Sequence, residues 1–228
     1  ARILVGTTGK AQREASLRPI HLLCPLLVLL AAASAVADPS DPLLLFTADG
    51  RGQATVVREE PGEDGVGGFA RRATYLRRTR VGGRVTPLLD AGGSLFGPES
   101  LASKGRLVVE AFDAMGYDAV NVSALDFQLG RDDTRALLSR GSFAAISANL
   151  MDAQSSRRLF APFLVRVHSG KRVAVIGVTE PPVGLELRPH LRRQLNGIRI
   201  QSPLEALAEV LPQAESQARP RKVTRSPR

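Results

Sequence analysis

Carboxylates and glycines gather in three short segments that each follow an apolar run. These segments are Thr47-Ala48-Asp49-Gly50-Arg51-Gly52, Leu89-Asp90-Ala91-Gly92-Gly93 and Val122-Ser123-Ala124-Leu125-Asp126-Phe127. Residues at the carboxyl ends of strands in an open α/β sheet converge on one crevice. Carboxylate oxygens are ligands for hard cations, so Asp49 and Asp126 are the candidate metal ligands. The alternative is that Asp49 pairs with Arg51, or caps its own turn, and leaves no place for a cation.

Short apolar runs bounded by turn residues predict the strands that would position these segments. The predicted strands are 43–46, 85–89, 118–122, 143–148, 163–167 and 173–178. The run at 43–46 is expected to be a buried strand, because it is short and apolar throughout. The last two strands are expected to pair through a turn at Ser169-Gly170.

Helical spacing of apolar residues separates several of the strands. Phe69, Ala73 and Leu76 predict one helix, with arginines largely on its other face, and a second helix is expected to end at Gly116. Residues 132–139 predict a short helix, and Ser202-Pro-Leu-Glu205 has the pattern of a capping box that opens a helix through Val210. Alternating strands and helices predict an α/β layered domain.

The first 37 residues have the layout of a secretory signal peptide. Basic residues precede the apolar run 22–33, and Ala35-Val36-Ala37 resembles a cleavage site. The alternative, an uncleaved membrane anchor, is disfavoured because the run is short and Pro25 interrupts it. We therefore expect a periplasmic or secreted protein without stable membrane insertion.

The positive charge lies at the two ends of the chain. Of the net charge of +9, residues 1–37 carry +3 and residues 214–228 carry +4, which leaves +2 for the predicted domain at 38–213. Such a body has no basic face for specific nucleic-acid binding. The tail at 214–228 is expected to be disordered, and either solvated or weakly attracted to anionic surfaces.

Cysteine and histidine usage excludes several kinds of site. Cys24 is the only cysteine, so an internal disulfide and a cysteine-based metal site are excluded. After the predicted signal peptide only His168 and His190 remain, and neither lies in one of the three segments. Both are expected to be ordinary histidines, and no nucleophile triad can be assembled.

Three further short segments alternate with or follow these three, and the order of all six along the chain is informative. The further segments are Gly67-Gly68-Phe69-Ala70-Arg71, Gly116-Tyr117-Asp118-Ala119-Val120 and Ser147-Ala148-Asn149. Together, from Leu43 to Thr179, they resemble the secreted 5′-nucleotidase and 2′,3′-cyclic phosphodiesterase family. The resemblance implies a layered α/β sandwich of the calcineurin-like metallophosphoesterase type, present as its N-terminal part and incomplete at the C-terminal side.

That family is hydrolytic and uses two metals, and the resemblance assigns its ligand positions one by one. Asp49 matches the first ligand, but Arg51 stands at the position of the family's histidine ligand. Gly93 stands at the position of the metal-bridging aspartate. Ala124 and Leu125 stand at the positions of an asparagine ligand and of a histidine near the phosphate. Arginine stays protonated, and glycine, alanine and leucine have no side-chain donor atom.

These substitutions predict an exported metallophosphoesterase-like domain that is catalytically impaired. The cleft that corresponds to the family's active site would bind a ligand or partner, and a nucleotide or another phosphate ester is the candidate. No cofactor is expected. The alternative is that the chain is the N-terminal fragment of an active metal-dependent phosphoester hydrolase of the nucleotidase type. In that case a divalent metal of the Mn²⁺ or Zn²⁺ type would be required.

Overall fold

The computed structural model describes residues 44–58, 64–80, 87–168, 170–182, 184 and 188–219. All of them belong to one of the two units into which the chain divides, Pro42–Arg228. The predicted signal peptide, with Cys24, lies outside the described residues. Along the chain the elements are β1 (Leu45–Thr47), α2 (Phe69–Thr79), β2 (Leu88–Asp90), α3 (Pro98–Ala102), α4 (Arg106–Met115), β3 (Ala119–Asn121), the 3₁₀ helix η1 (Ala124–Leu129), α5 (Arg131–Leu138), β4 (Ala144–Ile146), β5 (Leu150–Asp152), β6 (Phe163–His168), β7 (Lys171–Ile176), α6 (Pro189–Gln194), β8 (Ile198–Ile200) and α7 (Pro203–Ala218).

A four-stranded sheet in the order β1-β2-β3-β4 forms the centre of this unit. All three strand pairs are parallel, and Thr47 lies beside Asp90 in the register of β1 and β2. Parallel neighbours require crossover connections, which are helical between β2 and β3 and between β3 and β4. The predicted α/β fold class is confirmed.

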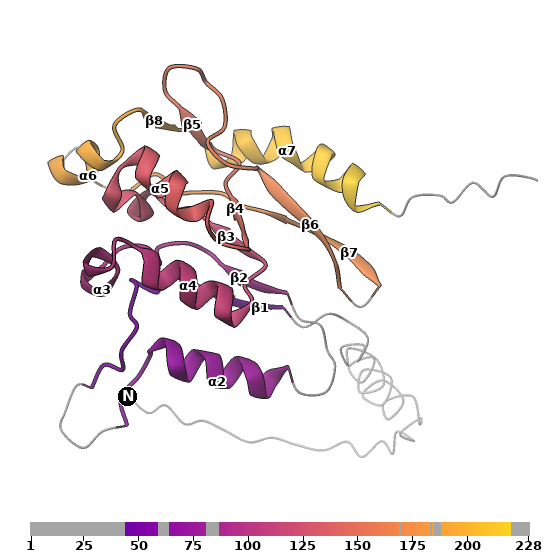
Figure 1. Cartoon of the computed structure of the whole chain (residues 1–228). Helices are drawn as coiled ribbons and strands as arrows, with labels where there is room; N and C mark the ends of the chain where they lie inside the picture. The colour runs from indigo at the N-terminus through magenta and orange to yellow at the C-terminus, as the bar shows by residue number, and fades with distance from the viewer. Residues whose placement is uncertain are drawn as a thin grey trace, which may run out of the picture. The chain divides into compact units, whose positions relative to one another are not determined.

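The helices α2, α4 and α5 lie together on one side of this sheet (Figure 1). Helix α4 buries Val108, Phe112 and Met115 in the main core, where Leu88 also lies. It ends, as predicted, at Gly116, whose φ of 69° is a left-handed conformation that favours glycine. Leu107 in the same helix is 39% exposed, so it lies outside the buried face.

A second layer covers part of the other face of the sheet. Strands β6 and β7 form the predicted antiparallel pair, and α7 packs against them through Ala206 and Val210. The pair approaches β4, because Ser147 N–H donates to Ala161 O at 2.9 Å and Ala148 N–H donates to Gly177 O at 2.7 Å. The order of layers is therefore helices, parallel sheet, hairpin and α7 (Figure 1).

The hairpin leaves the β1 side of that face uncovered, which corrects the prediction of a buried first strand. Strand β1 is an edge strand, and Phe46 is 70% exposed while Leu45 on the opposite face packs on the core. An apolar cavity of about 310 Å³ lies between this face and β7. A short run of apolar residues alone does not show whether a strand is covered on both faces or on only one face.

The last helix also differs from its prediction. Helix α7 extends to Ala218 and buries Ala214, so its final turn includes the first residues of the predicted tail. Ser202 is its N-cap and Pro203 opens it, but the Ser202 side chain makes no capping hydrogen bond. The tail from residue 220 onward lies outside the described residues.

Among the residues that the structure describes, no helix combines the length and apolar character needed to cross a bilayer.

Candidate functional site

The loops that follow the first three strands meet at the carboxyl edge of the sheet, and we call this junction of Asp49, Gly93 and Asp126 the crevice. Asp49 N–H donates to Gly92 O at 2.8 Å, and Arg51 N–H donates to Gly93 O at 2.9 Å. Gly93 N–H in turn donates to Asp126 Oδ2 at 3.0 Å. These hydrogen bonds join the loops after β1, β2 and β3, and they make neighbours of residues 33 to 43 positions apart in the sequence.

Asp49 and Arg51 form the predicted ion pair at the mouth of this crevice. The Arg51 guanidinium donates from Nη2 to Asp49 Oδ2 at 2.8 Å, and from Nε to the same oxygen at 3.1 Å. The hydrogen bond and charge of Asp49 raise the pKa of Arg51. Both side chains stay accessible, at 54% for Asp49 and 65% for Arg51. The guanidinium carbon also lies 5.7 Å from the centroid of the Phe96 ring.

The backbone at this pair is unusual for its residue types. Asp49 has a φ of 50° and Arg51 a φ of 48°, both in the left-handed region. Aspartate tolerates this region better than most residues, but arginine does so rarely. The two backbone hydrogen bonds to Gly92 and Gly93 hold the loop in this conformation, so the ion pair is presented at a fixed place.

Asp126 lies at the bottom of the crevice and holds the loops in place. Its Oδ2 accepts hydrogen bonds from Gly93 N–H at 3.0 Å, and from Ser123 N–H and Ser123 Oγ at 2.8 Å. Its Oδ1 accepts from Leu95 N–H at 2.8 Å. Ser123 and Asp126 form a capping box at η1, a role that the Ser-x-x-Asp spacing could have predicted. Metal binding by Asp126 stays a prediction. A metal there would have to compete with the four hydrogen bonds that the carboxylate already accepts.

Asp90 is the most perturbed acid of the site. Its Oδ2 accepts from Thr47 Oγ1 at 2.6 Å and from Ser94 Oγ at 2.9 Å, and its Oδ1 accepts from Gly92 N–H at 2.9 Å. Burial raises the pKa of Asp90 to about 6, although these hydrogen bonds oppose the change. The carboxyl group joins the end of β1 to the loop after β2.

The other positions predicted to be substituted, Ala124, Leu125 and Gly93, have packing or backbone roles in the fold. Ala124 is buried and Leu125 packs against the main core, so both belong to the apolar side of η1. A Cβ atom at Gly93 would lie 3.3 Å from Asp49 Cα and 3.4 Å from Asp49 Oδ1. With a φ of 75°, Gly93 also has a conformation that strains any other residue. A longer side chain at this position would enter the space beside Asp49.

A pair of metals does not fit the residues of this crevice. Asp49 is bound by a guanidinium and Asp126 is engaged by four donors, and the other predicted ligand positions carry Arg, Gly, Ala and Leu, which do not bind a cation. In the part of the chain described here, no three His, Cys, Asp or Glu residues are grouped so that they could hold a metal ion. The chemistry available at the mouth is that of an exposed guanidinium, which binds anions.

Two more polar contacts that the sequence did not indicate stabilise the surroundings. The Glu99 carboxylate accepts hydrogen bonds from Thr55 and from Ala54 N–H, which lower the pKa of Glu99. Asn149 is fully buried and joins the ends of β4 and β7, because its Nδ2 donates to Thr179 O at 2.7 Å and its Oδ1 accepts from Thr179 N–H at 2.8 Å. Neither contact has a local signal, because the partners are far apart in the sequence.

The two histidines lie away from the crevice. His168 ends β6 and is buried, with no hydrogen-bond partner for its Nδ1 among the described residues. His190 lies on α6 and is exposed.

Comparison with known proteins adds a family relationship to this geometry. No protein-family model matches the chain. Snake venom 5′-nucleotidase from Gloydius brevicauda is 30% identical over 185 residues, which cover 76% of this chain and 32% of that protein. The crystal structure of a 5′-nucleotidase precursor from Thermus thermophilus has a TM-score of 0.61 at 24% identity, covering 76% of this chain and 34% of that one. The calcineurin-like phosphoesterase YfkN from Bacillus subtilis has a TM-score of 0.60 at 19% identity, covering 76% and 58%.

These similarities confirm the predicted resemblance and the fold. The chain is homologous to 5′-nucleotidases and has the calcineurin-like phosphoesterase fold. It spans about a third of the length of the curated relatives that it matches.

Proposed function

We propose that this relative of the 5′-nucleotidases is an exported domain that binds a phosphate ester in its old cleft without hydrolysing it. The observation that carries the proposal is the Asp49–Arg51 ion pair, which occupies the mouth of the crevice at 2.8 Å. A nucleotide is the candidate ligand, because relatives of the chain are nucleotidases by name. Venom is the source of one relative, which agrees with export.

Loss of hydrolysis follows from the requirements of two-metal chemistry. Two divalent cations about 3.5–4 Å apart repel each other and need shared anionic ligands between them. Gly93 provides no carboxylate at the bridging position, and Ala124 provides no ligand oxygen. The positive charge of Arg51 further opposes a cation beside Asp49.

Binding of a phosphate ester without metals requires a cationic side chain, and Arg51 provides one. Its side chain is 65% accessible, and Asp49 and Phe96 fix its position before any ligand arrives. A guanidinium can bind a phosphate through two parallel hydrogen bonds. The phosphate would compete with Asp49 for the same donors, so binding is expected to be weak.

The first experiment tests for turnover. The purified chain with added Mn²⁺ or Zn²⁺ is incubated with AMP and with 4-nitrophenyl phosphate, and phosphate release is measured with and without EDTA. We expect no release above the protein-free control. Release that EDTA abolishes, and that the Asp49→Ala variant also lacks, would refute catalytic impairment.

The second experiment separates ligand binding by Arg51 from ligand binding through a metal. AMP affinity is measured by calorimetry in EDTA for the wild type and for Asp49→Asn, Arg51→Gln and Arg140→Gln. Releasing Arg51 from its carboxylate should strengthen binding about two- to fivefold in Asp49→Asn, in line with the strength of exposed ion pairs. Arg51→Gln should abolish binding, and Arg140→Gln, on the exposed surface after α5, should leave it unchanged. Weaker binding in Asp49→Asn would contradict the proposal.

The alternative is an N-terminal fragment of an active metal-dependent phosphoester hydrolase. One observation favours it, namely that the chain spans only 32% of the venom relative. Under this alternative, a longer form of the chain would supply the remaining metal ligands. That longer form should show metal-dependent phosphate release under the conditions of the first experiment.

A further inference from the structure

A groove of about 590 Å³ lies at the edge of the parallel sheet opposite to β1. Its lining comes from α5, from the segment at Gly141–Ala145 that leads into β4, and from Leu159–Ala161. Strands β2 and β3 stand between this edge and β1, whose carboxyl end leads to Asp49. The groove is therefore separate from the crevice described above.

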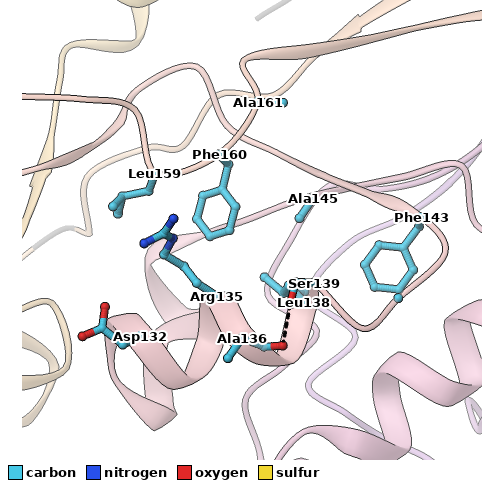
Figure 2. A pocket seen from close by; sticks show the side chains of 11 residues that line it. Asp132, Arg135, Ala136, Leu138, Ser139, Phe143, Ala145, Leu159, Phe160 and Ala161 are labelled. Carbon is cyan, nitrogen blue, oxygen red and sulfur yellow. Dashed lines mark hydrogen bonds between the residues drawn. The ribbon is translucent and has the colours of Figure 1, made fainter.

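Two aromatic rings form fixed apolar walls of this groove. The Phe160 ring lies 6.3 Å from the ring of the buried Phe127, and the Phe143 ring lies 6.1 Å from the ring of the buried Phe112. A Cβ atom at residue 141 would lie 2.5 Å from the Phe143 ring, so Gly141 allows this ring to lie against the backbone. Figure 2 shows Phe160 and Phe143 on either side of Ala145. Core packing holds both rings in place before a ligand binds.

Arg135 places a positive charge beside these rings. Its side chain extends from α5 toward Leu159 and Phe160 (Figure 2). Among the residues that the structure describes, its guanidinium donates no hydrogen bond, so its donors are available to a ligand. Asp132 also lines the groove, but its carboxylate is bound by another arginine.

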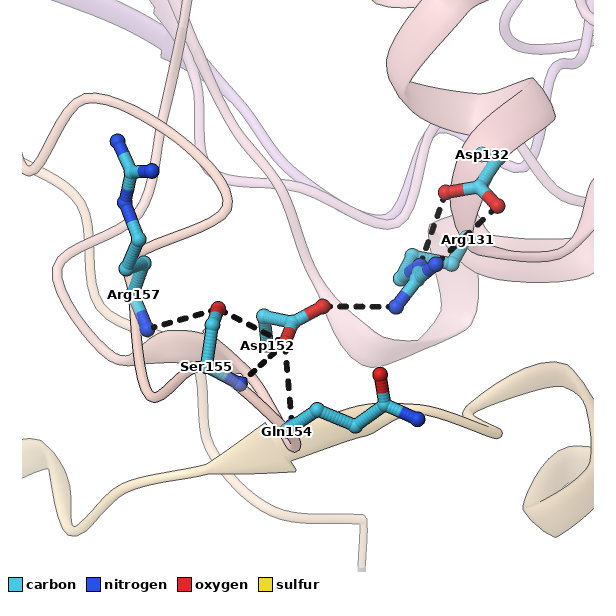
Figure 3. A network of polar contacts seen from close by, with 6 residues as sticks. All are labelled: Arg131, Asp132, Asp152, Gln154, Ser155 and Arg157. Atoms are coloured by element: carbon cyan, nitrogen blue, oxygen red, sulfur yellow. Dashed lines mark hydrogen bonds and ion pairs between the residues drawn. The ribbon is translucent and has the colours of Figure 1, made fainter.

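That other arginine is Arg131, which bridges two nearby carboxylates. Its Nε donates to Asp132 Oδ1 at 2.9 Å and its Nη2 donates to Asp132 Oδ2 at 3.2 Å. Its Nη1 donates to Asp152 Oδ2 at 2.7 Å (Figure 3). Asp132 forms its hydrogen bonds with Arg131, and the charges of Arg131 and Arg135 both help to lower the pKa of Asp132.

We propose that this groove binds a small aromatic carboxylate, with the ring between Phe143 and Phe160 and the carboxylate on Arg135. Flat aromatic rings pack favourably against aromatic walls, and a planar guanidinium matches a carboxylate in geometry. Arg135 donates no hydrogen bond within the described residues, although its charge acts on Asp132, so its donors can take one carboxylate. The proposal does not depend on the function proposed for the crevice.

The test uses 2-naphthoate and its neutral analogue 2-naphthalenemethanol. Each is titrated into the ¹⁵N-labelled chain, and amide shifts are followed for the wild type, Arg135→Gln and Arg140→Gln. Both arginines are exposed, so both variants should keep the wild-type spectrum outside the substituted region. Arg140 does not line the groove and serves as the matched control.

We expect 2-naphthoate to shift the amides of Ala136, Ala145 and Ala161. Arg135→Gln should weaken its binding about tenfold, as expected for a hydrogen bond to a charged group, and Arg140→Gln should not change it. The alcohol should bind equally to all three proteins. The proposal fails if 2-naphthoate binds no more tightly than the alcohol, if both variants weaken binding equally, or if the shifts lie around Arg51 instead.

Discussion

Asp49, Asp90 and Asp126 follow three neighbouring strands, yet each carboxylate has a different surrounding. Asp49 is exposed and is bound by a guanidinium. Asp126 is buried and accepts four hydrogen bonds. Asp90 has three donors and lies near Asp126, and its burial dominates, so its pKa rises to about 6. Side chains of one type therefore differ in chemistry because their donors and burial differ.

The raised pKa of Asp90 predicts how stability depends on pH. The folded state holds the Asp90 proton more tightly than the unfolded state, in which the pKa of aspartate is about 3.9. The stability that this group contributes is therefore present below about pH 4 and is lost as the pH rises through about 6. The full difference between the two pKa values corresponds to about 3 kcal/mol, of which roughly 2 kcal/mol is lost between pH 4 and pH 7.

Urea unfolding of the wild type and of Asp90→Asn at pH 4 and pH 7 measures this loss. Asparagine cannot accept all of the hydrogen bonds from Gly92 N–H, Thr47 and Ser94, so the variant should be less stable than the wild type at pH 4 by about 1–2 kcal/mol. It should equal or exceed the wild type at pH 7, because it never charges. Parallel pH dependences in the two proteins would show that Asp90 titrates alike in both states.

Among the elements, those with strong local signals could be predicted from the sequence. The periodicity of α4 and the glycine that ends it are both local, and its predicted end at Gly116 is confirmed. Strands β5 and β8 were not predicted, because each has three residues and forms only by pairing with the other across nearly 50 positions of the chain. Likewise the Asp49–Arg51 pair follows from a spacing of two residues. Two of the four donors to Asp126, the amides of Gly93 and Leu95, come instead from a loop 33 and 31 residues away.

The two faces of the sheet predict a contrast between two apolar residues in neighbouring strands. Leu88 of β2 is 1% exposed within the main core, so Leu88→Ala should cost about 2–5 kcal/mol of unfolding free energy. Phe46 of β1 is 70% exposed, so Phe46→Ala removes little buried area and should cost less than about 1 kcal/mol. Urea unfolding of both variants at one pH gives the comparison. A loss from Phe46→Ala as large as that from Leu88→Ala would mean that another segment covers β1 in solution.

At the scale of the whole molecule, the fold is that of a phosphoesterase, while the predicted ligand positions 51, 93, 124 and 125 carry Arg, Gly, Ala and Leu. The chain matches its relatives over three quarters of its length, and its sheet and helices match theirs in arrangement. The architecture is independent of the metal positions, because the loops are held by Asp90, Asp126 and backbone hydrogen bonds among the strand ends. A fold whose loops are fastened in this way can keep its shape without metals. Its stability should then be insensitive to them.

This independence gives a prediction that needs no enzymatic assay. A ligand that binds only the folded state stabilises it by about 4 kcal/mol at 1,000 times its Kd. For a chain of roughly 150–250 residues each kcal/mol raises Tm by about 2–4 °C, so a functional metal site would give a rise of roughly 8–16 °C. We expect less than about 1 °C between EDTA and 1 mM Mn²⁺, measured by differential scanning calorimetry, because Arg51 repels a cation from Asp49 and Gly93 offers no bridging carboxylate. A large rise that disappears in Asp49→Asn would place a metal in the crevice and favour the hydrolase alternative. A rise in Tm that persists in Asp49→Asn would instead show that Mn²⁺ binds elsewhere on the chain. The proposal that Arg51, and no metal, serves the crevice would then stand.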